Sequence, residues 1–345
     1  MFKHRQLTTA AVFSVLVVAA TASAPRAVAG ETPITGSGTI RLSGSDRYAT
    51  AVAISRKVFS PPQDVYVASG EDFPDALAVG PLAGRGLPNP ILLVRRTQLP
   101  QTTRAELQRL APQNVTIVGG RAAIAESVAQ AIAAAVPAAR VTRIDGANRY
   151  DTAAIIAEQM AAVQPWDRMV LVSGQNFPDA MAAGPLAAGF RGPLLLTGRD
   201  QLPPETGRVL QSVHPTTIWI VGGPGVVSES VVSQLRDDFS VTEVNRVWGP
   251  DRYATAERVA QTFGPQRRQS VVLASGTNFP DALAVVPVAA AQPLSGDFGG
   301  APILFTQSNC MPADTGRFLS GNQPLLRIVV GGVAVAYGGE RRCVP

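Results

Sequence analysis

Residues 41–50 read Arg-Leu-Ser-Gly-Ser-Asp-Arg-Tyr-Ala-Thr, and this ten-residue block returns twice along the chain. It recurs as Arg-Ile-Asp-Gly-Ala-Asn-Arg-Tyr-Asp-Thr at 143–152 and as Arg-Val-Trp-Gly-Pro-Asp-Arg-Tyr-Ala-Thr at 246–255. The copies start about 100 residues apart, a period that corresponds to a whole small domain and not to one turn of a solenoid. The chain therefore consists of three copies of one unit.

Two further blocks keep the same order and nearly the same period. One reads Ser-Gly-x-x-Phe-Pro-Asp-Ala-[Leu/Met]-Ala and stands at 69–78, 173–182 and 275–284. The other is Val-Gly-Gly, which stands at 118–120, 221–223 and 330–332. Because the same three blocks occur in the same order in each copy, we expect each copy to perform the same function.

The first copy alternates short apolar runs with segments of helical spacing. A helix is predicted over 48–59, followed by a buried strand at 64–68 that ends at Ser69-Gly70. The Phe-Pro-Asp block opens a second helix, because Asp72 can cap it, Pro74 suits its first turn and Asp75 lies three residues after the cap. Asn176 and Asn278 take the capping place in the other copies.

The rest of the copy continues the alternation. Strands are expected at 90–94 and 114–118, and helices at 101–110 and 122–136. Continuous apolar strands between helices are typical of a parallel sheet covered on both faces. The sequence therefore predicts an α/β protein of three tandem small domains, each a mostly parallel sheet with helices on both faces and its own core. We expect the three to pack with pseudo-threefold symmetry.

The repeats set the expected boundaries. We expect a signal peptide at 1–29, a short linker at 30–39, and repeats at 40–140, 141–243 and 244–345. The third repeat carries an insertion near 291–299 and has a truncated last helix, since the sequence ends soon after Gly332. Only the short linker lies outside the signal peptide and the repeats, so we expect no effector domain.

The amino-terminal segment predicts export. Basic residues precede an apolar stretch at 10–20, and small residues follow up to Ala27-Val-Ala29, the layout of a secretory signal peptide. The apolar stretch is too short to span a bilayer, so we expect no membrane span in the mature chain. Removal of the signal takes Lys3, Arg5 and Arg26 from a chain of net charge +5. The nearly neutral remainder argues against nucleic acid as a partner.

Cysteine usage agrees with an oxidising compartment. The two cysteines, Cys310 and Cys343, both lie in the third copy and are expected to form a disulfide there. Two thiols without a nearby His fall short of a four-ligand zinc site. We therefore expect neither a metal nor a cofactor.

Repeated catalytic chemistry is not supported. His214 is the sole histidine after the signal and occurs in one copy, which excludes three Ser-His-Asp sites. Gly119-Gly120 begins no Gly-x-Gly-x-x-Gly fingerprint, so nucleotide binding is disfavoured. A single active site near His214 remains an alternative.

The repeated polar residues are the candidate ligand contacts. Arg suits this task because its planar fork forms paired hydrogen bonds with carboxylate or phosphate, although an Arg could equally bind the Asp of its own domain. The Ser-Gly blocks belong to the same set because ligands in open parallel sheets bind at the carboxyl ends of the strands. The candidates are Arg41, Arg47, Tyr48, Ser69, Gly70, Asp75, Arg143, Arg149, Tyr150, Ser173, Gly174, Asp179, Arg246, Arg252, Tyr253, Ser275, Gly276 and Asp281.

In this order the three blocks resemble those of the bacterial cell wall-binding repeat family of the second type, over about residues 40 to 345. The resemblance implies three α/β repeats around a pseudo-threefold axis, with ligand contacts near the Arg-Tyr and Ser-Gly blocks. It also implies non-covalent attachment to anionic polymers of the Gram-positive wall.

We therefore expect a secreted, wall-associated, non-catalytic protein that binds an anionic polysaccharide or a teichoic-acid-like polymer. The expected oligomeric state is a monomer with an internal pseudo-trimer. Two alternatives stay open: a wall hydrolase or modifier with one active site, and a structural protein that binds another protein.

Overall fold

The computed structural model describes residues 38–72, 74–85, 88–175, 177–291, 300–339 and 341–343. The expected signal peptide, the linker up to residue 37 and the insertion at 292–299 lie outside this part of the chain. Within it, no helix combines the length and the apolar character that a membrane crossing requires.

Strands and helices alternate in every copy. The first copy holds β1 (Gly38–Leu42), α1 (Arg47–Val58), β2 (Asp64–Ser69), the 3-10 helix η1 (Pro74–Ala76), α2 (Val79–Ala83), β3 (Ile91–Val94), α3 (Gln101–Leu110), β4 (Asn114–Val118) and α4 (Glu126–Ala135). The second holds β5 (Arg140–Ile144), α5 (Arg149–Val163), β6 (Arg168–Ser173), α6 (Phe177–Gly189), β7 (Leu194–Thr197), α7 (Pro204–Val213), β8 (Thr217–Val221) and α8 (Glu229–Asp237). The third holds β9 (Glu243–Val247), α9 (Arg252–Gln261), the 3-10 helix η2 (Pro265–Gln269), β10 (Ser270–Ser275), α10 (Phe279–Ala291), β11 (Ile303–Thr306), α11 (Ala313–Asn322) and β12 (Leu326–Val330).

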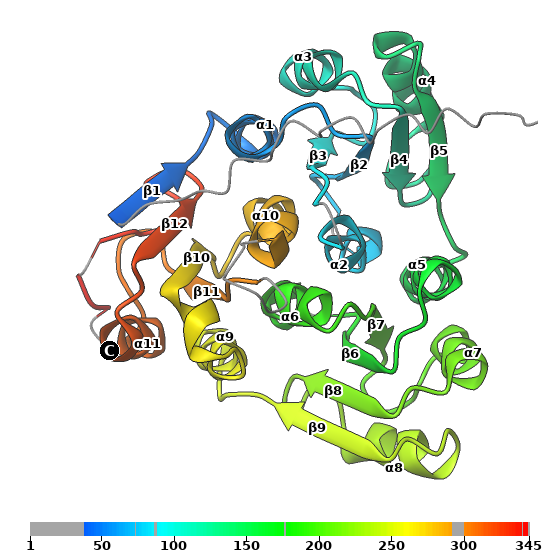
Figure 1. Ribbon diagram of the computed structural model, residues 1–345, viewed down its shortest axis with the longest axis vertical. Coiled ribbons are helices and arrows are strands. Elements are labelled where there is room, and N and C mark those ends of the chain that lie inside the picture. The colour runs from blue at the N-terminus through cyan, green and yellow to red at the C-terminus, as the bar shows by residue number, and fades with distance from the viewer. Residues whose placement is uncertain are drawn as a thin grey trace, which may run out of the picture. The chain divides into compact units, whose positions relative to one another are not determined.

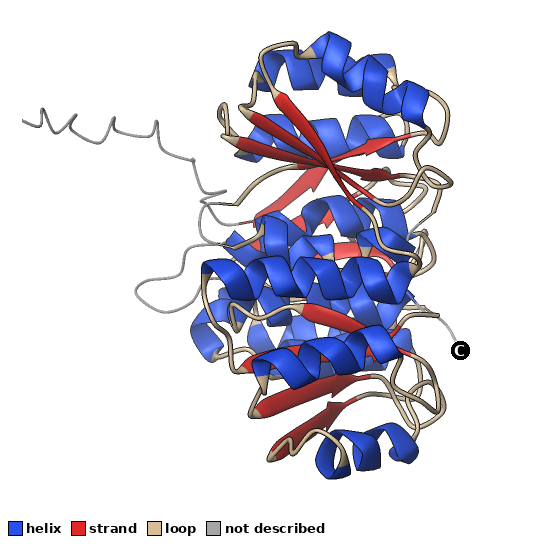
Figure 2. Cartoon of the chain, turned by 90° about the vertical axis from the view of Figure 1, so that its right-hand side faces the viewer, coloured by secondary structure: helices blue, strands red, loops and turns tan. Residues whose placement is uncertain are grey.

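The strands form three four-stranded parallel sheets, which confirms the predicted fold class. Their orders are β3-β2-β4-β5, β7-β6-β8-β9 and β1-β12-β10-β11. Helices cover both faces of the sheets, as the side view shows (Figure 2). The apolar strands are buried as a result, which is why they read as continuous apolar runs.

Each sheet borrows its last strand from the next copy. β5 opens the second copy but pairs with β4 of the first, and β9 pairs with β8 in the same way. β1, the first described strand, pairs with β12, the last one, from Gly38 opposite Leu326 to Leu42 opposite Val330. The expectation that each copy closes its own core is therefore wrong, because the copies interlock in a cycle (Figure 1).

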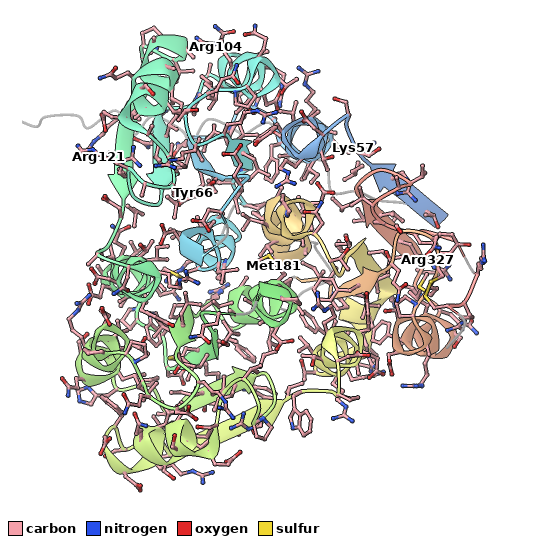
Figure 3. The ribbon with its side chains drawn as sticks, turned by 180° about the vertical axis from the view of Figure 1, so that it is seen from behind. Lys57, Tyr66, Arg104, Arg121, Met181 and Arg327 are labelled. Atoms are coloured by element: carbon pink, nitrogen blue, oxygen red, sulfur yellow. A yellow bond between two sulfur atoms is a disulfide. The ribbon has the colours of Figure 1, made fainter. Side chains whose placement is uncertain are left out.

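The helices that follow Phe-Pro-Asp meet at the centre of the cycle. α2, α6 and α10 contact one another pairwise (Figure 1). The side chain of Val286 on α10 fills the space that a Cβ would take at Gly80 of α2 and at Gly184 of α6, at 2.5 and 2.9 Å. Met181 of α6, 1% exposed, also lies near this centre, whereas Lys57 and Arg121 lie at the outside (Figure 3).

Two helices differ from the sequence prediction. In the first copy the Phe-Pro-Asp block forms η1, and α2 begins only at Val79 without a side-chain cap, so Asp72 does not cap it. The helix predicted over 122–136 begins at Glu126, because the amides of Ala123 and Ile124 turn back to the carbonyl of Gly120. In the other copies α6 and α10 do begin at the Phe of the block.

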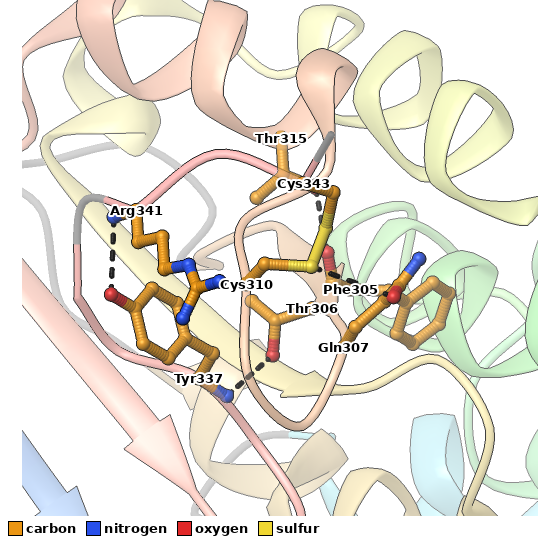
Figure 4. Close-up of a disulfide and its surroundings, with 8 residues drawn as sticks. All are labelled: Phe305, Thr306, Gln307, Cys310, Thr315, Tyr337, Arg341 and Cys343. Carbon is orange, nitrogen blue, oxygen red and sulfur yellow. Dashed lines mark hydrogen bonds between the residues drawn. A yellow bond between two sulfur atoms is a disulfide. The ribbon is translucent and has the colours of Figure 1, made fainter. Parts of the chain in front are cut away.

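The third copy ends differently from the others. No helix follows β12 among the described residues, where the first two copies have α4 and α8. The chain instead returns to the loop after β11, and Cys310 forms a disulfide with Cys343 (Figure 4). The amide of Tyr337 donates to Thr306 Oγ1 at 3.0 Å, and the amide of Cys343 donates to the carbonyl of Met311 at 2.9 Å. The segment after β12 therefore packs against the loop after β11.

Candidate functional site

The candidate residues gather at three joints, where the carboxyl ends of the strands of one copy meet the ten-residue block of the next. We call them joint 1–2, joint 2–3 and joint 3–1 after the copies that they connect. Joint 3–1 closes the cycle, since it brings β12 against β1 and α10 against α1.

The ten-residue block forms a strand end, a turn and a capped helix start. Asp46, Asn148 and Asp251 are the N-caps of α1, α5 and α9, and their side chains accept backbone amides of the first turn. The threonine at the end of each block accepts the backbone amide of the block's glycine, for example Gly146 N to Thr152 Oγ1 at 3.1 Å. The Asp/Asn, Gly and Thr of the motif are thus structural.

The tyrosine of the block packs on the Ser-Gly turn of its own copy. A Cβ at Gly70 would lie 2.8 Å from Cε1 of Tyr48, and the corresponding distances at Gly174 and Gly276 are both 2.7 Å. A side chain at any of these positions would therefore force the tyrosine ring or the backbone to shift. Ser69, Ser173 and Ser275 are buried, and each Oγ accepts a backbone amide of the following turn.

The second arginine of each block, Arg47, Arg149 or Arg252, donates to the carbonyl of that same turn. Arg149 Nη1 lies 2.7 Å from the oxygen of Gly174, and Arg252 Nη1 lies 2.6 Å from that of Gly276. Arg47 donates to Gly70 in the same way. The Arg-Tyr pair and Ser-Gly are thereby joined within one copy.

The first arginine connects neighbouring copies. Arg143 Nη1 donates to the carbonyl of Gly119 at 2.7 Å, and Arg246 Nη1 donates to that of Gly222 at 2.9 Å. Their other terminal nitrogens lie 3.9 and 3.1 Å from the carboxylates of Glu126 and Glu229 at the starts of α4 and α8. These arginines hold the borrowed strand to the Val-Gly-Gly turn.

At joint 3–1 the first arginine makes the same backbone bonds as at joint 2–3, where Arg246 Nη1 also donates to the carbonyl of Val227 at 2.8 Å. Arg41 Nη1 donates to the carbonyl of Gly331 at 2.6 Å and to that of Ala336 at 2.9 Å. Burial lowers the pKa of its guanidinium. Two backbone carbonyls therefore bind the first arginine at both of these joints, and at joint 2–3 the ion pair with Glu229 adds to them.

The aspartate of Phe-Pro-Asp lies inside each joint. Asp179 and Asp281 are 6% and 4% exposed, and Asp75 is half-buried. Each carboxyl abuts the first glycine of Val-Gly-Gly: a Cβ at Gly119, Gly222 or Gly331 would lie 3.2, 3.3 or 2.6 Å from it. Those glycines have φ of 111°, 131° and 103°. This backbone conformation is unfavourable for any residue that carries a side chain.

Burial shifts the pKa of these carboxyl groups. It raises the pKa of Asp179 and of Asp281 to about 6, and it raises the pKa of Asp75 as well. In each case the second arginine of the next copy partly offsets the increase: Arg149 acts on Asp75, Arg252 on Asp179 and Arg47 on Asp281.

The idea that Arg binds the Asp of its own domain is therefore wrong. No ion pair joins these arginines to these aspartates within the described part of the chain. The arginine whose charge lowers the pKa of each aspartate belongs to the next copy. The candidates predicted from the sequence do not include Thr50, Thr152 and Thr255 or the first glycine of Val-Gly-Gly. Their recurrence in all three copies was the signal that could have revealed them.

His214 does not lie at a joint. It is exposed and ends α7 with φ of 53°, and the same helix-ending position is held by Ala111 and Gln323 in the other copies. Since Ala and Gln serve equally there, the position requires no imidazole. In the described residues, no three His, Cys, Asp or Glu side chains cluster in a way that could hold a metal ion.

The interlocked sheets and the joints define a closed, threefold α/β repeat protein. The chain belongs to the cell wall binding domain 2 (CWB2) family, whose model matches residues 41–129, 143–232 and 246–338. Each match begins at the first arginine of a ten-residue block, so the resemblance drawn from the three blocks is confirmed. Cell wall binding domains imply association with the cell surface.

Relatives and solved structures agree with this assignment. The chain is 31% identical over 250 residues to the N-acetylmuramoyl-L-alanine amidase LytC of Bacillus subtilis, covering 72% of this chain and 48% of that protein. It is 30% identical over 275 residues to the amidase enhancer of the same organism, covering 80% and 36%. Among solved structures, Cwp6 from Clostridium difficile matches 90% of this chain and 48% of its own length, with a TM-score of 0.77 and 26% identity. The chain thus spans about a third to a half of these relatives.

Proposed function

We propose that this is a secreted, non-catalytic protein that attaches to anionic polymers of the Gram-positive cell wall through its three repeats. The threefold recurrence of the joints carries the proposal, because three similar sites can bind several repeating units of one polymer chain at the same time. Several weak sites on one polymer chain raise avidity far above that of any single site.

We place the ligand contacts near the Arg-Tyr and Ser-Gly blocks, at the three joints. The relatives support attachment as the shared task. LytC is named as an amidase of N-acetylmuramoyl-L-alanine, and the second relative as an amidase enhancer, yet both match this chain over its repeats. We infer that the shared segment holds such proteins at the wall.

Sedimentation with purified walls tests the proposal. The protein should pellet with intact walls, pellet less as salt increases because charged contacts are screened, and stay in solution when the walls have lost their anionic polymers. Undiminished retention on stripped walls, or no binding to intact walls, would contradict it.

Two controls separate the alternative functions. A zymogram on wall substrate should show no clearing; a band that disappears in His214→Ala would identify a hydrolase. Protease treatment of the walls should leave binding intact, whereas loss of binding would identify a protein partner.

A further inference from the structure

Joint 2–3 holds a pocket with an aromatic side chain in its lining. This pocket of about 340 Å³ opens between the end of β8 and the start of α9. Asp179 and Gly223 line it from the second copy, and Trp248, Arg252 and Thr255 line it from the third. Its volume is near the lower end of the range for small-ligand sites, which suits a single ring-sized group.

Trp248 presents an apolar surface in this pocket. Its side chain is 39% exposed, and it stands where the other copies have Ser43 and Asp145. The indole ring is supported on one side by the backbone, since a Cβ at Gly223 would lie 2.8 Å from its Cε3 atom. Arg258 donates to the carbonyl of Trp248, and its guanidinium carbon lies 6.0 Å from the ring centre. The ring is therefore held in place while a large part of it faces solvent.

Asp179 offers a hydrogen-bond acceptor beside that ring. At joint 1–2 the carboxyl binds a threonine hydroxyl, since Thr152 Oγ1 lies 3.3 Å from Asp75 Oδ1. At joint 3–1 the Oδ1 atom of Asp281 is buried without a hydrogen-bonding partner among the described residues. At joint 2–3 the equivalent Thr255 hydroxyl lies 3.5 Å from the carbonyl of Gly249 instead. Among the described residues the 6% exposed Asp179 carboxyl has no hydrogen-bonding partner, although it lines the pocket.

We propose that this pocket is a subsite for one uncharged sugar ring of the wall polymer, with Trp248 stacking on the ring and Asp179 accepting a hydroxyl hydrogen bond. A pyranose has a face of C–H groups and a rim of hydroxyls, which matches an indole face next to a buried acceptor. A buried carboxylate repels an anion, so the charged groups of the polymer contact the protein elsewhere.

This inference rests on the proposed function and adds to it the part of the polymer that is recognised. It also makes joint 2–3 unequal to the others, because neither Ser43 nor Asp145 can stack on a sugar. Binding by charge alone would not depend on Trp248, so the two contributions can be measured separately.

Quantitative sedimentation with intact walls tests the subsite. Trp248→Ala should weaken binding about tenfold, the loss expected when an aromatic anchor is truncated, and Trp248→Phe should retain most of the affinity. Asp179→Ala should weaken binding similarly. Val163→Ala, which shortens an 84% exposed apolar side chain on α5, is the matched control and should bind like the wild type.

The outcomes distinguish the two proposals. If the wild type binds walls and Trp248→Ala binds equally well, the sugar subsite is overturned and the proposed function stands. If the wild type does not bind intact walls, both fail. Thermal unfolding of each variant verifies that a loss of binding does not reflect a loss of folding.

Discussion

Arg41 donates a hydrogen bond of 2.6 Å to the carbonyl of Gly331, which lies 290 residues further along the chain. The bond joins the first described strand to the turn after the last one, and Arg143 and Arg246 make the equivalent bonds at the other joints. The cycle of three sheets is therefore closed by the same contact that connects its consecutive copies.

Removing this contact should weaken the closure. Arg41→Ala leaves the carbonyls of Gly331 and Ala336 without their donor, so we expect the free energy of unfolding to fall by about 1–3 kcal/mol. Urea denaturation measures the change. Lys57→Ala, at an exposed position on α1, is the control and should differ from the wild type by less than about 0.5 kcal/mol. Equal stability of the two variants would show that the closure does not depend on Arg41.

The contact between tyrosine and glycine predicts a second effect. Gly276→Ala places a Cβ 2.7 Å from the ring of Tyr253, and the backbone or the ring must shift, so we expect a loss of about 1–3 kcal/mol. Gly321→Ala is a matched control, because no atom lies within 4 Å of the added Cβ in α11. That change should stabilise the protein by up to about 1 kcal/mol, because alanine favours a helix. If chemical denaturation showed that both variants change the free energy of unfolding in the same direction, the packing argument would be refuted.

The sequence identified the elements whose signal is local. The predicted helix at 101–110 coincides with α3, and the predicted strands at 64–68 and 114–118 coincide with β2 and β4 to within one residue. These strands lie inside sheets, and their apolar runs reflect burial. The recurrence of the blocks predicted that the protein consists of three copies of one unit.

The borrowed strands were missed because they lie at sheet edges. β5 reads Arg-Val-Thr-Arg-Ile and β9 reads Glu-Val-Asn-Arg-Val, with polar residues at the first, third and fourth positions and mostly half-exposed side chains. Such segments lack the continuous apolar run of a buried strand. The interlocking of the copies was therefore not predictable from local pattern.

The candidate site was predicted as a set of residues but not as an arrangement. Asp75 contacts Thr152, and the arginine that acts on its pKa is Arg149, so both partners belong to the next copy. Once the strand exchange is known, these pairs follow. Trp248 is not among the predicted candidates, because its position holds Ser43 and Asp145 in the other copies and only recurring residues indicate a shared site.

The disulfide should matter for the returning tail. The double variant Cys310→Ser/Cys343→Ser removes a crosslink across 33 residues, which the chain-entropy model values at roughly 3 to 4 kcal/mol. We expect a lower unfolding temperature. Reduction of the wild type should produce the same decrease, and reductant should not affect the variant, since the chain has 2 cysteines. An unchanged unfolding temperature on reduction would show that the backbone bonds from Met311 and Tyr337 suffice.

The buried aspartates predict how stability depends on pH. Because burial raises the pKa of Asp281 from 3.8 to about 6, the folded protein binds more protons than the unfolded chain between these values. This contribution to the free energy of unfolding is therefore fully favourable below about pH 4 and is lost as the pH rises through 6. Asp179 has a pKa of about 6 for the same reason and acts in the same direction.

Asp281→Asn isolates this effect. The amide carries no charge to desolvate, so the variant should be more stable than the wild type at pH 7.5, by on the order of 1–3 kcal/mol, and the difference should vanish near pH 4. Denaturation curves at several pH values measure it. Asp314→Asn, at a partly exposed residue on α11 whose carboxylate pairs with Arg317, is a control that should give no such gain at pH 7.5. A gain that is equal at pH 4 and pH 7.5 would mean that repacking, and not the carboxylate charge, accounts for it.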